Sequence, residues 1–92
     1  MLPTLLIVDD ERATREGLRS ALEEEFEVYT ASGTEEALTI LRSEPIQLLL
    51  TDLRLGGDSG MDLLQAAQAL PEPPVSLIMT AYGSVDTAVQ GM

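Results

Sequence analysis

Leu48-Leu49-Leu50-Thr51-Asp52 is the stretch that decides the fold. It is a short, continuous apolar run that ends in a carboxylate. Runs of this kind, when they alternate with segments of helical periodicity, are typical of strands buried on both faces of a parallel sheet, because helices must cover both sides. The sequence therefore predicts an α/β fold built on a doubly wound parallel sheet.

Two other apolar runs have the same form. Residues 5–8 are followed by Asp9 and Asp10, and residues 75–79 are followed by Thr80. Parallel strands all point the same way, so their polar ends meet at one edge of the sheet, where ligands bind in open α/β folds. We therefore expect the aspartates at 9, 10 and 52 to share a crevice, with the hydroxyl of residue 80 opposite them.

Between these runs the chain alternates helices and strands in the order βαβαβαβα. Helices are expected over residues 11–24, 33–42 and 61–70, with an edge strand over 26–30 and a last helix beginning at Ser84. Asp9 or Asp10 is expected to cap the first helix. The glycine-rich loop over residues 56–60 indicates special backbone angles or a close approach to something bound. The apolar stripe expected to be buried on the first helix consists of Ala13, Leu18, Ala21 and Leu22.

Composition narrows the class of protein. The 92 residues fit one domain, residues 1–92, with an apolar core rich in aliphatic side chains. Sixteen acidic residues against five arginines give a net charge of -11, which repels nucleic acid. We expect no direct nucleic-acid contact by this domain. No cysteine occurs, and no segment predicts a membrane span or a signal peptide, so a cytoplasmic location is expected.

The three aspartates suggest a specific chemistry. Carboxylates within several ångströms of one another repel, so that either one takes up a proton or a cation joins them. A hard ion such as Mg²⁺ prefers oxygen ligands of this type. A carboxylate can also be the nucleophile in phosphoryl transfer. Asp52, alone at its strand end, is the expected phosphoryl acceptor, and Asp9 and Asp10 are the expected metal anchors.

A purely structural interpretation also exists. Asp9 and Asp10 could cap a helix and Asp52 could open a turn, since aspartate is common in both places. The combination favours a site, because caps do not require neighbouring strands of a sheet to end in coordinating groups. Thr80 alone is a weak signal, because a hydroxyl after a strand often bonds only to backbone.

The whole chain resembles a response-regulator receiver domain, and one segment resembles receivers of NtrC-like, enhancer-binding transcriptional activators. The resemblance implies a flavodoxin-like sheet of strand order 2-1-3-4. It further implies a signalling domain that assists only its own phosphorylation and dephosphorylation and is not otherwise an enzyme. The segments that carry it are Val8-Asp9-Asp10-Glu11, Thr51-Asp52-Leu53-Arg54-Leu55 and Met79-Thr80-Ala81-Tyr82-Gly83-Ser84.

Residue by residue, the resemblance implies Asp52 as the phosphoacceptor for a partner sensor histidine kinase. Asp10 would bind Mg²⁺ directly and Asp9 through water, with Asp52 and the backbone carbonyl of Arg54 as further ligands. Thr80 would be the switch hydroxyl, which turns toward the phosphoryl group. Together with the fourth helix it would relay the signal to a transcriptional output domain outside this chain.

The sequence departs from the family in two ways. Gly56 stands where the family usually has proline, which should loosen the loop. The family also has a fifth strand carrying a lysine, followed by a fifth helix, whereas this sequence has no lysine and matches only through the fourth helix. On this reading the receiver is incomplete, and residues 75–79 form an exposed apolar edge. We therefore expect self-association through the fourth strand or the fourth helix.

Two other functions remain open. The chain could be a phosphorylation-deficient receiver fragment that serves as a dimerisation or interaction module, which the missing lysine favours. It could also be a Mg²⁺-dependent phosphatase that uses Asp52 as nucleophile. That activity needs an acidic general acid shortly after the nucleophile, and Arg54 stands there instead.

Overall fold

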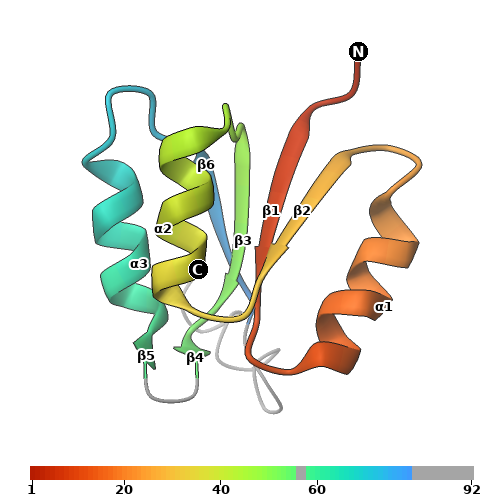
Figure 1. Ribbon diagram of the computed structural model, residues 1–92, viewed down its shortest axis with the longest axis horizontal. Helices are drawn as coiled ribbons and strands as arrows, with labels where there is room; N and C mark the ends of the chain where they lie inside the picture. Colours follow the sequence, from red (N-terminus) through yellow and green to blue (C-terminus); the bar gives the residue numbers. More distant parts are fainter. Residues whose placement is uncertain (56–57, 80–92) are drawn as a thin grey trace, which may run out of the picture.

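The computed structural model describes residues 1–55 and 58–79. Its centre is a four-stranded parallel sheet in the order β2-β1-β3-β6 (Figure 1). This arrangement confirms the predicted α/β fold and the 2-1-3-4 order, since β6 is the fourth strand of this sheet along the chain. It also confirms that the second strand lies at an edge. The strands are β1 (Thr4–Val8), β2 (Glu27–Ala31), β3 (Leu48–Asp52) and β6 (Val75–Met79).

Helices cover both faces of the sheet, as the apolar strand sequences require. Figure 1 shows α2 (Thr34–Ser43) and α3 (Gly60–Gln68) side by side on one face and α1 (Arg12–Leu22) on the other. Glu35 and Glu36 lie in the first turn of α2, where negative charge is favourable at the positive end of the helix dipole. The three helices begin and end close to the predicted positions.

The core lies between the sheet and the α2–α3 pair. Alternate residues of the central strands point to this face, so Leu6, Val8 and Leu49 are all fully buried. The two helices complete the core with the residues that their 3.6-residue period places inward. These helix residues are Ala37, Leu41, Leu63 and Ala67.

The face covered by α1 is packed less completely. Contrary to the prediction of a buried stripe, no residue of α1 is buried. Leu18 and Leu22 are half-buried, but Ala13 and Ala21 are exposed. The physical reason is that α1 is the only helix on this face in the described part of the chain. Without a neighbouring helix, the residues along the two margins of the apolar stripe of α1 stay in contact with solvent.

The predicted cap of α1 is also wrong. The N-cap residue is Glu11, which is extended and forms no side-chain capping hydrogen bond. Asp9 lies two residues before the N-cap, and its Oδ1 accepts a hydrogen bond of 2.8 Å from the backbone N–H of Glu11. The carboxylate therefore closes the turn that leads into the helix and does not cap the helix itself.

A short antiparallel pair, β4 (Arg54–Leu55) with β5 (Asp58–Ser59), was not predicted. It lies where the glycine-rich loop was expected. Gly60 follows this pair, and what it approaches closely is the backbone of the chain itself rather than something bound: a Cβ there would overlap the carbonyl oxygen of Asp52. The Gly60 N–H donates to the carbonyl of Leu53 at 2.9 Å. Glycine at this position therefore lets the start of α3 lie against the end of β3.

Some predicted features lie outside the described residues. They are the hydroxyl of Thr80, the helix expected from Ser84, and the loop position Gly56.

Gly17 provides a direct test of α1. It lies in the middle of the helix and is exposed, and within residues 1–55 and 58–79 no atom outside its own stretch of helix lies within 4 Å of a Cβ built on it. Gly17→Ala should therefore stabilise the protein by about 0.5–1 kcal/mol, because alanine is the better helix former. Urea unfolding measures this gain, and Gly17→Ser should give about half of it. A Gly17→Ala protein no more stable than wild type would contradict the open environment seen at this position.

Candidate metal and phosphoryl-acceptor site

The strand register brings the predicted carboxylates together. β1 and β3 pair in parallel with Val8 opposite Thr51, so the chain delivers Asp9, Asp10 and Asp52 to the same edge of the sheet. Each of the three offers a carboxylate oxygen, and these oxygens all lie within 4.8 Å of one another. The predicted convergence of the three aspartates is confirmed.

Asp9 is the innermost member of the cluster. It is only 5% exposed, and its backbone N–H donates to the carbonyl of Ala31 on β2 at 3.1 Å. Burial raises the pKa of this carboxyl above its ordinary value, and the negative charges of Asp52, Asp10 and Glu11 raise it further. The hydrogen bond from the Glu11 N–H opposes this shift in pKa but does not cancel it.

The other two aspartates are more exposed to solvent than Asp9. Asp52 is half-buried at the end of β3, and Asp10 is exposed. Directly before Asp52, the side chain of Thr51 is fully buried, and its hydroxyl donates to the Asp52 carbonyl at 3.0 Å. The Asp52 side chain therefore extends from a firmly packed strand into a cluster that opens to water.

This donor set fits a hard divalent cation. All three groups supply oxygen ligands. They also repel one another, which contributes to the raised pKa of Asp9, and no member of the cluster is positively charged. The cluster could therefore bind a metal ion. The role predicted for the backbone carbonyl of Arg54 stays a prediction; that residue begins β4, two positions after Asp52.

One residue that contacts this site, Arg15, was not predicted from the sequence. Its Nη1 donates a hydrogen bond of 2.7 Å to the backbone carbonyl of Asp9. The sequence signal was only an arginine in the second turn of a helix that begins just after the two aspartates. The pattern of apolar residues does not show that an arginine at this position would contact the site.

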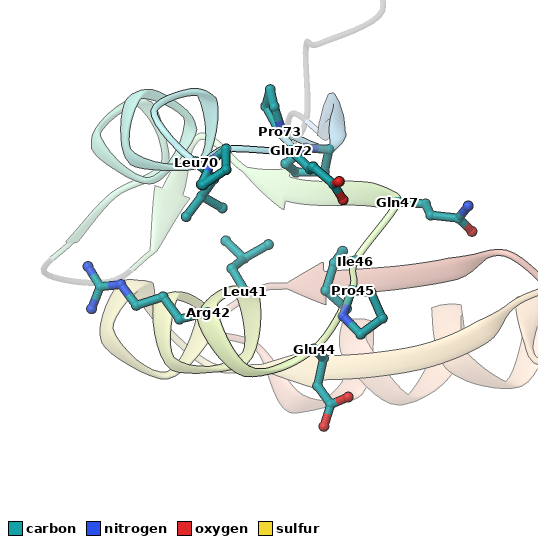
Figure 2. Close-up of a pocket in the computed structure, with 11 residues that line it drawn as sticks. Leu41, Arg42, Glu44, Pro45, Ile46, Gln47, Leu70, Glu72 and Pro73 are labelled. Carbon is teal, nitrogen blue, oxygen red and sulfur yellow. The ribbon is translucent and has the colours of Figure 1, made fainter.

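A separate groove lies at the opposite edge of the sheet, where β3 and β6 begin. Figure 2 shows Leu41 from α2 and Leu70 from the segment after α3 pointing toward each other across it, while Arg42 points away. Prolines 45, 71, 73 and 74 contribute to its lining. The groove contains no cluster of carboxylates comparable to the one at the other edge, so we place the chemistry at the aspartates.

Comparison with known proteins identifies the family. The response regulator receiver domain matches residues 5–92, nearly the whole chain. This chain belongs to the response regulator receiver domain family. The match includes all three clustered aspartates and both strands that carry them.

Curated relatives of this receiver are named as response regulators or transcriptional regulatory proteins. The chain is 46% identical over 89 residues to the response regulator protein PilR of Pseudomonas aeruginosa, covering 95% of this chain and 20% of PilR. It is 39% identical over 89 residues to the alginate biosynthesis transcriptional regulatory protein AlgB of the same species, covering 96% of this chain and 20% of AlgB. These relatives confirm the resemblance to the NtrC-like group. The chain spans about a fifth of the length of the curated relatives it matches.

A solved receiver has the same architecture. The CheY-like receiver domain protein of Methanospirillum hungatei JF-1 superimposes with a TM-score of 0.84 at 32% identity, covering 97% of this chain and 72% of that one. The flavodoxin-like fold is thereby confirmed. In residues 1–55 and 58–79, no helix combines the length and the hydropathy that crossing a bilayer requires.

The environment of Asp9 predicts how stability depends on pH in the absence of metal. Because its pKa is raised above 3.8 in the folded state, the folded chain binds more protons than the unfolded chain between the two pKa values. The contribution of Asp9 to stability therefore falls as pH rises through that interval. Asp9→Asn keeps the oxygen that accepts from Glu11 and removes the charge, so it should raise the Tm at pH 7 in EDTA, with a smaller gain near pH 4.

Circular dichroism melts at both pH values measure this difference, and each 1 kcal/mol of stabilisation raises the Tm of a domain of this size by roughly 4–8 °C. Glu24→Gln is the control, because it removes the same charge from an exposed residue. If Asp9→Asn melted at or below the wild-type temperature at pH 7, the conclusion that the negative charge of Asp9 destabilises the fold would be wrong.

Proposed function

We propose that this receiver accepts a phosphoryl group from a sensor histidine kinase on Asp52, with Mg²⁺ as cofactor. The observation that carries the proposal is the convergence of three carboxylates within 4.8 Å at one edge of the sheet. Membership of the receiver family and similarity to response regulators support the same assignment.

The proposed chemistry is an in-line transfer. A carboxylate oxygen of Asp52 attacks the phosphorus of the kinase phosphohistidine; the P–O bond forms, the P–N bond breaks, and the released imidazole takes a proton from water. Mg²⁺ would be held by Asp10 and Asp52 directly and by Asp9 through water, with the Arg54 carbonyl as a further ligand. The ion supplies neutralisation of the phosphoryl charge. Beyond assisting its own phosphorylation and dephosphorylation, the domain catalyses no reaction.

The signal then passes to a transcriptional output domain. We assign the switch hydroxyl to Thr80 and the relay to the helix expected after it, and a few kcal/mol of differential stabilisation suffices to shift a two-state element. The net charge of -11 supports an arrangement in which another domain contacts DNA. A cytoplasmic location agrees with this role in signalling.

Phosphorylation tests the proposal directly. Incubation with acetyl phosphate and Mg²⁺ should add one phosphate to the chain, detected by intact-protein mass spectrometry. Asp52→Asn should abolish the addition, because it removes the nucleophile. Asp62→Asn is the matched control, since Asp62 is an exposed aspartate of α3 outside the cluster, and it should be phosphorylated like wild type. Wild type that takes up no phosphate, or Asp52→Asn that still does, would refute the assignment.

A second candidate function is self-association as an interaction module, and one observation favours it. β6 is the last strand of the described sheet, and its side chains Val75, Leu77 and Ile78 are 63%, 53% and 46% exposed. An apolar edge strand without charged residues is a template for pairing with another strand. We propose that a second copy of this chain pairs there.

Light scattering after size exclusion tests this pairing at micromolar concentration. Wild type should have a mass above that of the monomer, which rises with concentration. Leu77→Lys should shift it to monomer, because a charge in an edge strand opposes pairing. Leu2→Lys, which introduces the same charge at an exposed leucine outside the sheet, should behave like wild type. A wild-type monomer at every concentration would exclude this second function.

A further inference from the structure

Asp9 is held at three points. Its N–H donates to the Ala31 carbonyl at 3.1 Å, and its Oδ1 accepts from the Glu11 N–H at 2.8 Å. Its carbonyl accepts from Nη1 of Arg15 at 2.7 Å. The donors of the first two hydrogen bonds are backbone N–H groups, so substitution of a side chain other than that of Asp9 does not remove them. Only the third depends on a side chain elsewhere in the chain.

The third contact fixes the peptide between the two aspartates. The carbonyl of Asp9, the N–H of Asp10 and the Asp10 Cα belong to one planar peptide unit, so a donor that holds the carbonyl also fixes the orientation of that unit and the place of the Asp10 Cα. Within residues 1–55 and 58–79 the Asp10 side chain has no hydrogen bond of its own, and it is exposed. Its position in the cluster is therefore set by its backbone.

Arg15 is suited to this role by its own placement. It lies in the second turn of α1, it is half-buried, and its bond to the carbonyl is short and charge-assisted. A planar guanidinium loses less freedom than an ammonium when it is held in one orientation. The contact joins α1, which has no buried residue, to the strand end that carries the aspartates.

We infer that Arg15 is a positioning residue for metal binding: by holding the Asp9 carbonyl, it orients the Asp10 carboxylate toward the cation. This inference rests on the proposed function, because it assumes that the aspartate cluster binds Mg²⁺. It assigns Arg15 no contact with the ion or with the phosphoryl group.

The sign of the effect separates positioning from simple charge. Arg15 is a cation near a cation site, so if only its charge mattered, removing it would strengthen Mg²⁺ binding. If Arg15 positions Asp10, removing its side chain weakens Mg²⁺ binding. Mutation of a residue that orients a metal ligand without contacting the metal typically lowers metal affinity by about 10–100-fold. The two interpretations thus predict opposite changes.

The experiment measures Mg²⁺ affinity by calorimetry, and the response of the Asp10 amide to Mg²⁺ by NMR, in the full chain. Arg15→Met keeps the aliphatic stem and loses the donors; it should bind Mg²⁺ about tenfold more weakly than wild type. Arg12→Met is the matched control: Arg12 is exposed in the first turn of the same helix and forms no side-chain hydrogen bond within the described ranges. It should bind as tightly as wild type, or slightly more tightly.

Melting in EDTA separates this role from a structural one, because a residue that only stabilises α1 would lower the Tm and leave the Mg²⁺ affinity unchanged. Arg15→Met with wild-type or tighter affinity would overturn the inference while leaving the proposed function intact. Wild type that binds no Mg²⁺ would overturn both. Should Arg15→Met fail to fold, Arg15→Lys is compared with Arg12→Lys: the former should bind about threefold more weakly, and equal affinities would overturn the inference.

Discussion

Parallel pairing of β1 with β3 is the constraint on which the site depends. Val8 lies opposite Thr51, so the strand ends deliver three carboxylates to one place. Two unit charges 4 Å apart near a protein surface repel by about 4 kcal/mol, a large share of the roughly 5–15 kcal/mol that stabilises a domain. The buried leucines at 6 and 49 oppose that repulsion by fixing the register, because a slip of one residue would turn the buried side chains of the slipped strand to the other face of the sheet. Apolar packing thus keeps the acidic site assembled.

The two faces of the sheet contribute differently to this assembly. The α2–α3 face holds the continuous core, and Thr51, the residue directly before Asp52, is fully buried. The α1 face is looser, and its helix reaches the site through the half-buried Arg15. Asp52 is therefore positioned by a packed core, whereas the segment with Asp9 and Asp10 is positioned by hydrogen bonds. The segment with Asp9 and Asp10 is the part of the cluster that depends most on individual polar contacts.

The sequence was sufficient to predict the strands and the convergence of the aspartates, because apolar runs and the common direction of parallel strands determine both, whereas the strand order came from the resemblance to receiver domains. It was not sufficient for features that depend on tertiary surroundings. Periodicity identified the apolar side of α1 but not how much of it is covered, so Ala13 and Ala21 were misjudged. Two adjacent aspartates were both plausible caps, and only coordinates show that Glu11 is the N-cap. The β4–β5 pair and the Arg15 contact arise from backbone geometry that no residue pattern encodes.

The central claim is that the ends of β1 and β3 form a single site for a divalent cation. Paramagnetic Mn²⁺, titrated into isotope-labelled protein, broadens the NMR signals of nearby amides and so locates the ion. We predict broadening that is strongest at Asp9, Asp10 and Asp52 and weaker at Thr4 and Leu48, the amides at the start of the same strands. Broadening spread evenly over the acidic surface, or centred away from these three aspartates, would contradict the account.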